Sequence, residues 1–256
     1  MEYQHLQWEL DGPVATVWLA RPPVNAVNQE MYEEIQRLFF GIGQLGDDVR
    51  VVVLAGEGRH FCAGNDLEEF TTLDSQNSRK RMFNAREAFW AIYTCDVPVI
   101  AAVHGSALGT GLAIAASCDL VVAADGARLG LPEINVGVMG GAKHLSRLVP
   151  QAVVRRMFYT GEPVAASEMV PHGGVLKVVP QDQLLDTARS LARDIARHSP
   201  VALRYAKRSL TTIEFMDLKE GYEFEQGLTG ELSDHPDSKE AVAAFLEGRE
   251  PTYRPS

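Results

Sequence analysis

Two glycine-containing turns hold the residues whose types and spacing could do chemistry. Residues 61–67 read FCAGNDL, and residues 104–111 read HGSALGTG. Each turn follows a short apolar run and leads into the start of a helical pattern, where backbone N–H groups have no partner inside the helix. The N–H groups of Asn65 and Thr110 can therefore point at a common position. Two such donors from separate segments form an oxyanion hole, which stabilises negative charge that develops during a reaction.

The glycines of either turn alone would be interpreted as ordinary loop residues. Both turns follow buried strands, however, and this favours a functional interpretation of the pair. We expect Cys62 to be a small buried residue and His104 to have a structural role. Ser106 does not lie in a GxSxG elbow, which disfavours a Ser-His-Asp hydrolase.

A third glycine pattern does not predict a nucleotide site. Residues 41–46 read GIGQLG and fit the GxGxxG pattern of dinucleotide-binding turns. In those turns a strand precedes the glycines and a helix follows them. Here the pattern lies at the end of a predicted helix and before a predicted strand, so we expect no nicotinamide or flavin site.

The elements that must position the two turns alternate between strands and helices. Predicted strands cover residues 14–19, 51–54, 97–103 and 119–123, and predicted helices cover residues 28–39, capped by Asn28, then 79–93 and 112–116. Short alternating elements of this kind predict an α/β fold. After about Pro180 the strands stop. The helices predicted there cover residues 183–198, 200–212, 218–232 and 238–247. They are too few to form a core of their own, so we expect them to pack on the core or on another subunit.

Composition excludes several classes of function. The formal net charge of −10 disfavours nucleic acid and anionic membranes as partners, because both require clustered Lys and Arg. The chain has 3 cysteines without CxxC spacing, which is typical of a reduced intracellular protein. The first ten residues indicate a strand and not a signal peptide, and no segment is long enough to span a membrane. We therefore expect a cytoplasmic protein.

Several motifs in a fixed order make the chain similar to the crotonase (enoyl-CoA hydratase/isomerase) superfamily over nearly its whole length. The motifs are RPPVNA at residues 21–26, AGND at 63–66, HGSALG at 104–109, CDLVVA at 118–123, LPEI at 131–134 with Gly137, and AFLEGR at 244–249. The resemblance implies a crotonase-like spiral of ββα units with a helical C-terminal part. It divides the chain into a spiral acyl-CoA-binding core, residues 1–195, and a helical trimerisation region, residues 196–256. It also implies a homotrimer or homohexamer.

The resemblance further implies that the substrate is an acyl-coenzyme A (acyl-CoA) thioester. Coenzyme A would be part of the substrate, with no metal or redox cofactor. The amides of Asn65 and Thr110 would hold the thioester carbonyl and stabilise an enolate, and Glu133 matches the family's catalytic glutamate. Leu129, Leu131 and Ile134 surround Glu133 in sequence, and an apolar pocket would raise the pKa of its carboxyl.

Departures from the family pattern concern the second acid. Hydratases of the family usually carry another glutamate in the helix after the second turn, where this chain has Ala113. A single carboxylate cannot hold the attacking water molecule in the way that two carboxylates do. The segment after Gly137, residues 138–144, is also shorter than the corresponding segment in the family. Lys143 and His144 in this segment are candidate substitutes for the missing acid. We favour the alternative expectation, that both side chains are exposed to solvent in the first turn of a helix.

The remaining positions are carried over from the family. For coenzyme A the resemblance points to a set of residues near the adenine and pantetheine: Val24, Ala63, Asp66, Leu67 and Glu68. A C-terminal basic residue, Arg249 or Arg254, is a candidate partner for the phosphates. Asp66 and Asp119 match positions that shape turns, so neither is assigned a proton transfer. Thr110 stands where the family often has Gly, and its side chain narrows the expected pocket without removing the amide.

These observations favour proton shuttling, in which one glutamate isomerises the double bond of an enoyl-CoA. The first alternative is an enoyl-CoA hydratase or hydratase-lyase that uses Glu133 alone. The second alternative is a non-catalytic scaffold that binds acyl-CoA.

Overall fold

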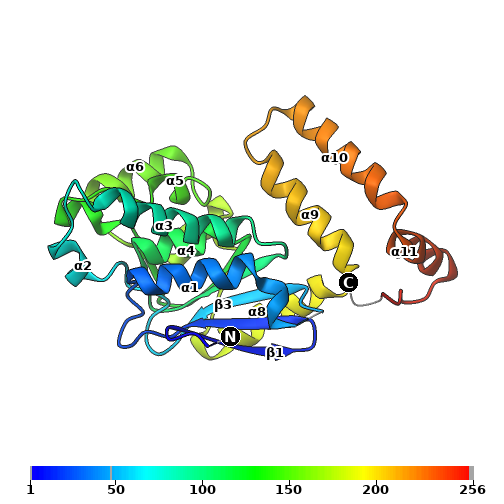
Figure 1. The fold of residues 1–256 in the computed structure, drawn as a ribbon, viewed down its shortest axis with the longest axis horizontal. Coiled ribbons are helices and arrows are strands. Elements are labelled where there is room, and N and C mark those ends of the chain that lie inside the picture. Colours follow the sequence, from blue (N-terminus) through cyan, green and yellow to red (C-terminus); the bar gives the residue numbers. More distant parts are fainter. Residues whose placement is uncertain (1, 47, 254–256) are drawn as a thin grey trace.

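The computed structural model describes residues 2–46 and 48–253, and two sheets organise its N-terminal part (Figure 1). The larger sheet has six strands in the order β1-β2-β3-β4-β6-β9, and the smaller has three in the order β5-β7-β8. The β1/β2 and β7/β8 pairs are antiparallel, and the other pairs are parallel. The strands are β1 (Leu6–Asp11), β2 (Val14–Leu19), β3 (Val51–Gly56), β4 (Val99–Val103), β5 (Ser106–Leu108), β6 (Leu120–Ala124), β7 (Arg128–Gly130), β8 (Val164–Ala165) and β9 (Lys177–Val179).

From β4 onward the chain passes back and forth between the two sheets, and this path produces the spiral. After β4 it enters β5 and then a helix, and after β6 it enters β7 and further helices, before β8 joins the smaller sheet and β9 joins the larger one. The units that begin with β4 and β6 therefore each add one strand to each sheet. The predicted spiral of ββα units is confirmed, including the end of the strands near Pro180.

Helices cover both faces of the larger sheet. The core helices are α1 (Gln29–Phe40), α2 (Leu67–Thr71), α3 (Ser78–Tyr93), α4 (Thr110–Ser117), α5 (Ala142–Leu145), α6 (Gln151–Thr160), α7 (Ala166–Met169) and α8 (Leu184–Ala196). Short 3-10 helices are η1 (Ile42–Leu45), η2 (Pro132–Val136), η3 (Val170–His172) and η4 (Gln181–Gln183). Successive strand residues point to opposite faces, so Val52 packs with α1, α3 and α4, whereas Val51 packs with α8. Because both faces of the central strands β3 and β4 are buried, these two strands are continuous apolar runs.

Helix α1 is fixed by its N-terminal cap. The Asn28 side chain accepts a hydrogen bond from the Met31 N–H at 2.9 Å, as the sequence predicted. The buried side of α1 carries Met31, Tyr32 and Ile35. This anchoring matters for the site, because Tyr32 points from α1 toward both glycine turns.

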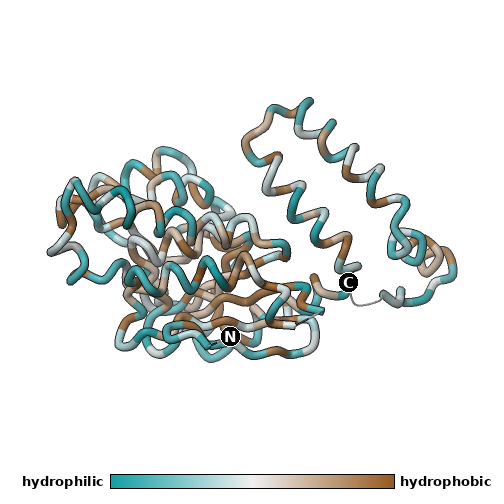
Figure 2. Tube along the Cα trace, in the orientation of Figure 1, coloured by the Kyte–Doolittle hydropathy of each residue, from teal (hydrophilic) through white to brown (hydrophobic). Residues whose placement is uncertain are grey.

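The C-terminal helices α9 (Pro200–Ile213), α10 (Leu218–Ser233) and α11 (Pro236–Glu247) extend away from the core as an arm (Figure 1). Hydrophobic and hydrophilic residues alternate along this arm, whereas hydrophobic residues concentrate in the strands of the core (Figure 2). Lys207 on α9 ties the arm to the core, because its Nζ lies 2.7 Å from Asp119 Oδ1. Asp119 Oδ2 also accepts the Val99 N–H at 2.7 Å, which fits the expected turn-shaping role.

Candidate active site

Backbone hydrogen bonds hold the two glycine turns side by side. The Cys62 N–H donates to the Ser106 carbonyl, and the Leu108 N–H donates to the Cys62 carbonyl, both at 3.0 Å. A Cβ on Gly111 would collide with the Cys62 carbonyl, so this close approach requires glycine at position 111. The structure therefore brings together the segments that the sequence singled out.

The local pairing sets the direction of the Asn65 N–H. On the two sides of Asn65, the Gly64 carbonyl accepts the Val27 N–H and the Asp66 N–H donates to the Val27 carbonyl, both at 2.9 Å. In extended backbone, successive groups point to opposite sides, so the N–H of Asn65 points away from Val27. Asn65 is also one of the residues that line a cavity.

Thr110 is the first residue of α4, where an N–H has no acceptor within the helix. Among the hydrogen bonds of the residues that the structure describes, none is donated by the backbone N–H of Asn65 or of Thr110. Both residues line the same cavity. Two unpartnered donors at one cavity are the arrangement that an oxyanion hole requires.

The cavity has a volume of about 230 Å³ and lies between the two turns, α3 and the segment after η2. Its walls combine backbone from both turns with apolar side chains. The lining residues are Tyr32, Asn65, Leu73, Met82, Ala85, Phe89, Gly109, Thr110, Ala113, Glu133, Val138, Met139, Gly140 and Gly141.

Glu133 is the carboxylate of this cavity. It lies in η2, and its half-buried position raises the pKa of its carboxyl above the ordinary value. Its Oε2 atom is buried and has no hydrogen-bond partner among the described residues. A carboxylate oxygen without a partner is available to accept a proton from a bound molecule.

Gly109 lets this carboxylate approach the second turn. A Cβ at position 109 would lie 2.7 Å from Glu133 Oε1, and Gly109 has a φ of +53°. Both the space and the backbone conformation require glycine here. Glu133 therefore lies beside the residue that precedes the Thr110 donor.

Position 113 faces the cavity without supplying an acid. Ala113 is buried in α4 and lines the cavity that Glu133 also lines. Among the described lining residues, Glu133 is the one carboxylate. The predicted consequence of Ala113, a site with a single carboxylate, agrees with this geometry.

Sequence reasoning missed Tyr32. Its hydroxyl lies 2.5 Å from Asn65 Oδ1 and 2.8 Å from Thr110 Oγ1, so it contacts both residues that carry the candidate donors. Burial raises the pKa of Tyr32, which keeps the phenol protonated. The hydroxyl at an otherwise apolar helix position was the available signal, since a buried Tyr hydroxyl requires a partner.

Lys143 and His144 are absent from the lining of this cavity and contribute instead to a neighbouring one of about 180 Å³. Lys143 is exposed, and its Nζ lies 4.5 Å from the centre of the Phe215 ring. His144 is partly buried, with its ring centre 4.9 Å from that of Phe89. The expectation of a solvent-facing His144 is therefore wrong, because α3 covers it. Burial and the nearby Arg147 lower the pKa of His144, which favours the neutral imidazole.

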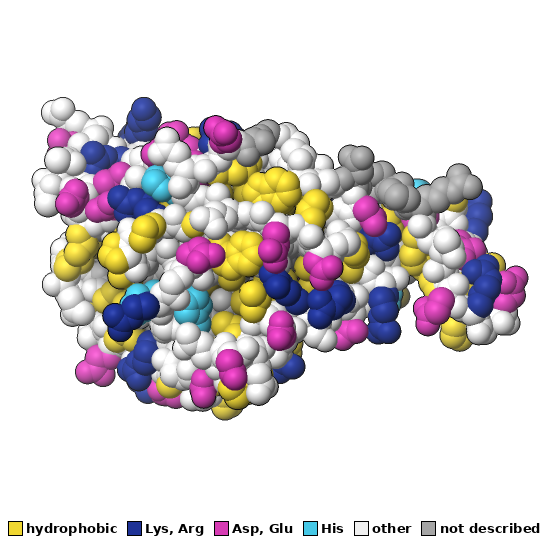
Figure 3. All heavy atoms as spheres, turned by 90° about the horizontal axis from the view of Figure 1, so that it is seen from below, with side chains coloured by type: hydrophobic (Ala, Val, Ile, Leu, Met, Phe, Trp, Pro, Cys, Tyr) yellow, Lys and Arg dark blue, Asp and Glu magenta, His cyan; other side chains and the backbone are white. Residues whose placement is uncertain are grey.

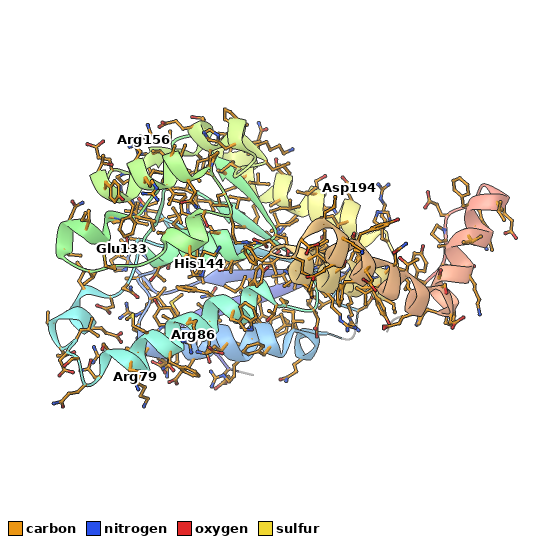
Figure 4. The ribbon with its side chains drawn as sticks, turned by 90° about the horizontal axis from the view of Figure 1, so that it is seen from above. Arg79, Arg86, Glu133, His144, Arg156 and Asp194 are labelled. Carbon is orange, nitrogen blue, oxygen red and sulfur yellow. The ribbon has the colours of Figure 1, made fainter. Side chains whose placement is uncertain are left out.

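In Figure 4, Glu133 and His144 lie between α3, which carries Arg79 and Arg86, and α6, which carries Arg156, while Asp194 lies farther away toward the C-terminal helices. Phe89 of α3 lines both the candidate cavity and the neighbouring cavity, so its ring borders each of them.

The residues carried over for coenzyme A lie along one edge of the first turn. The Ala63 N–H donates to the Val24 carbonyl at 3.0 Å. Asp66 accepts the Glu68 N–H at 3.0 Å, and its Oδ2 lies 2.6 Å from an Arg21 nitrogen. Leu67 and Glu68 are exposed at the start of α2. The role of these five residues stays a prediction.

The two C-terminal arginines differ. Arg249 is paired with Glu240 and Glu247, each at 2.6 Å, so its guanidinium already has anionic partners. Arg254 lies outside the described residues. Arg249 is not among the described residues that line the cavity.

Other side chains of the two turns are structural. Cys62 is fully buried, and burial raises the pKa of its thiol to about 12, as expected for an unreactive core cysteine. His104 is buried, and its Nε2 lies 3.0 Å from the Gly58 carbonyl oxygen.

The described side chains provide no group of three or more His, Cys, Asp or Glu residues positioned around a metal ion. Among the described helices, none combines the length and apolar character needed to cross a membrane. On the face shown in Figure 3, basic side chains are interspersed with acidic ones.

Comparisons with known proteins place this geometry among relatives. The family model described as "Enoyl-CoA hydratase/isomerase" matches residues 9–255. The chain is 38% identical over 245 residues to the (7aS)-7a-methyl-1,5-dioxo-2,3,5,6,7,7a-hexahydro-1H-indene-carboxyl-CoA hydrolase of Rhodococcus jostii, with 94% of this chain and 93% of that protein covered. It is 34% identical over 256 residues to the short-chain-enoyl-CoA hydratase of Clostridium acetobutylicum, with 97% of each chain covered. The crystal structure of an enoyl-CoA hydratase from Bacillus anthracis matches with a TM-score of 0.93 at 30% identity, covering 99% of this chain and 100% of that one.

Proposed function

The chain belongs to the enoyl-CoA hydratase/isomerase family and is an acyl-CoA enzyme of the crotonase type, and we propose that its reaction passes through a thioester enolate for which Glu133 alone moves the proton. The single observation that carries the proposal is the unpartnered, buried Oε2 of Glu133 in a cavity without another carboxylate among its described lining residues.

The proposed reaction is the isomerisation of an enoyl-CoA. The N–H groups of Asn65 and Thr110 bind the thioester carbonyl oxygen. Glu133 takes a proton from the carbon next to the carbonyl of a 3-enoyl-CoA, and the electron pair of the broken C–H bond moves into the conjugated enolate. Glu133 then returns the proton to the far end of the allylic system, which yields the 2-enoyl-CoA. Loss of one oxyanion-hole donor typically lowers the rate about 100-fold or more.

A spectroscopic test separates isomerisation from hydration. A 2-enoyl-CoA and a 3-enoyl-CoA are supplied separately, and the absorbance of the conjugated thioester is followed. The isomerase proposal predicts that absorbance grows from the 3-enoyl-CoA. Rapid loss from the 2-enoyl-CoA with no gain from the 3-enoyl-CoA would support the hydratase alternative. Binding of both without turnover of either would support a scaffold.

A second candidate, hydrolytic ring opening, is favoured by the relatives. Two of them, 38% and 39% identical, are named hydrolases of a bicyclic diketone joined to CoA. If a ring ketone lies beta to the thioester, Glu133 can take a proton from water while the water oxygen bonds to the ketone carbon. Cleavage of the adjacent C–C bond leaves its electron pair on the thioester enolate, which the same two N–H groups hold. Glu133 then protonates the enolate carbon, so that one water is added in total.

This second candidate has its own test. A cyclic 2-oxocycloalkane-carboxyl-CoA, which has no double bond to hydrate, is incubated with the enzyme and analysed by mass spectrometry. A product heavier by one water, with an opened ring and a new carboxylate, supports hydrolysis. An unchanged substrate excludes it for this compound.

We place coenzyme A beside the first turn, along Val24, Ala63, Asp66, Leu67 and Glu68. The hydrogen bond between Ala63 and Val24 and the exposed start of α2 support this placement, since together they form a continuous edge next to Asn65.

For the assembly we propose a homotrimer or homohexamer formed through the C-terminal arm. Exposed hydrophobic side chains on or beside α9, α10 and α11 support this, because monomeric proteins rarely expose large apolar patches. They are Leu210, Phe215, Met216, Leu218, Tyr222, Val242, Phe245 and Leu246. The molar mass from light scattering tests the proposal, and a monomer at micromolar concentration would contradict it.

A further inference from the structure

The hydroxyl of Tyr32 lies between two residues that are far apart in the sequence. Its oxygen is 2.5 Å from Asn65 Oδ1 in the first turn and 2.8 Å from Thr110 Oγ1 in the second turn. Both residues line the candidate cavity, and their backbone N–H groups have no acceptor among the described residues. One side chain therefore contacts both halves of the candidate oxyanion hole.

The hydrogen bonds have a defined direction. A phenol has one O–H to donate, and the amide oxygen of Asn65 can only accept, so Tyr32 donates to Asn65. The Thr110 hydroxyl then donates to the Tyr32 oxygen. The result is a chain of donors that runs from Thr110 through Tyr32 to Asn65.

The position of the Tyr32 hydroxyl is itself fixed. Tyr32 is 1% exposed and lies in the first turn of α1, which Asn28 caps. Its ring packs edge-on against Phe89 with the centroids 6.0 Å apart. A residue held by its helix and by its ring presents the hydroxyl in one place.

We infer that Tyr32 is a positioning residue that braces the oxyanion hole, setting the separation and direction of the Asn65 and Thr110 N–H groups through their side chains. This inference rests on the proposed function, because it assigns those N–H groups to a thioester carbonyl. It also gives the Thr110 hydroxyl a role beyond narrowing the pocket. Donors held in place before the reaction stabilise an enolate more strongly than donors that must reorganise.

The test uses butyryl-CoA labelled with ¹³C at the thioester carbonyl. This saturated probe has the carbonyl and the acidic α-protons but no double bond. Two readouts are measured on the full-length protein: the infrared carbonyl frequency of the bound probe, and the exchange of its α-protons in D₂O. Tyr32→Phe removes the hydroxyl and retains the ring, Thr110→Val removes the other hydroxyl and retains the N–H, and Thr110→Ser restores it. Tyr159→Phe, at an exposed tyrosine of α6, is the matched control.

If Tyr32 positions the two N–H groups, the carbonyl frequency of the bound probe should shift downward less in Tyr32→Phe and Thr110→Val than in the wild type. Exchange of the α-protons at saturating probe should slow roughly 10-fold to 100-fold, because small misplacement of reacting groups lowers the rate by this order. The dissociation constant of the probe should change much less. Exchange in the double variant should be about as slow as in either single variant, because both substitutions break the same chain of hydrogen bonds. Thr110→Ser should recover most of the loss seen in Thr110→Val, and Tyr159→Phe should match the wild type.

The positioning role of Tyr32 would be overturned by wild-type values of both readouts in Tyr32→Phe and Thr110→Val. It would also be overturned if the effects of the two substitutions multiplied in the double variant. If Tyr32→Phe does not fold, Thr110→Val decides alone. Absence of both the frequency shift and exchange in the wild-type protein would instead overturn the proposed function, and the brace with it.

Discussion

The Oε1 atom of Glu133 lies 2.7 Å from the position that a Cβ atom on Gly109 would occupy. The proposed proton carrier is thus in contact with the backbone that presents the Thr110 N–H. A base and an oxyanion donor on adjacent backbone can act on neighbouring atoms of one thioester, the α-carbon and the carbonyl oxygen.

Gly109→Ala should displace the Glu133 carboxylate and slow α-proton exchange by about 100-fold, as expected for misplacement of a reacting group. Gly126→Ala is the control, because Gly126 also has a positive φ, +79°, but has open space around it. Both variants strain the backbone, and only Gly109→Ala pushes on the carboxylate. Equal exchange rates in the two variants would show that contact with Glu133 is unimportant.

The pH dependence of exchange should report the raised pKa of Glu133. The reaction needs the carboxylate, so the rate falls as pH falls, with a midpoint above the value of about 4.3 for an ordinary glutamate. A profile with its midpoint at or below the ordinary value would disagree with the buried position of Glu133.

Glu133→Gln should stabilise the fold at neutral pH. Because the pKa of Glu133 is raised in the folded state, the folded protein holds the proton more tightly than the unfolded chain. Stability from this group is therefore lost as pH rises from the unfolded pKa through the folded pKa. Thermal unfolding at several pH values tests the sign: the variant should gain over wild type at neutral pH and not at pH 4.

Ala113→Glu should convert the site toward the two-carboxylate arrangement. A second carboxylate facing the cavity would raise the pKa of Glu133 further by like-charge repulsion, moving the midpoint of the pH profile up by about one unit or more. It should also increase hydration of a 2-enoyl-CoA. Ala113→Gln provides similar bulk without charge, and an equal shift in both variants would assign the effect to bulk alone.

Lys207→Met should weaken the attachment of the arm. The Lys207 ammonium is buried and contacts both oxygens of Asp119, at 2.7 and 2.8 Å. Because Asp119 is exposed and stays solvated when Lys207 is removed, the free energy of unfolding should fall by about 1 kcal/mol. Denaturant unfolding measures this loss, with the exposed Lys219→Met as control. A loss no larger than that of the control would mean that the pair contributes little.

The sequence predicted the elements with strong periodicity. The apolar runs of β2, β3, β4 and β6 and the capped helix α1 all formed where expected, within a few residues at their ends. The smaller sheet was not predicted, because β5, β7 and β8 have three residues or fewer. Strands this short show no alternation, and their pairing depends on the larger sheet that carries them.

At the site, the two turns and Glu133 could be predicted because each lies in a local motif. Tyr32 and His144 could not be placed in the same way. Tyr32 follows Met31 on the buried side of α1, and only the tertiary fold brings its hydroxyl to both turns. His144 is covered by Phe89 of α3, a contact that spacing along the chain does not reveal.

The central claim is that Glu133 moves a proton next to a thioester carbonyl, and α-proton exchange tests it most directly. Butyryl-CoA in D₂O is followed by mass spectrometry with the wild-type protein and with Glu133→Gln. The account predicts exchange by the wild type and a loss of about 100-fold or more in the variant, the usual contribution of a general base. Exchange at the wild-type rate in Glu133→Gln would contradict it.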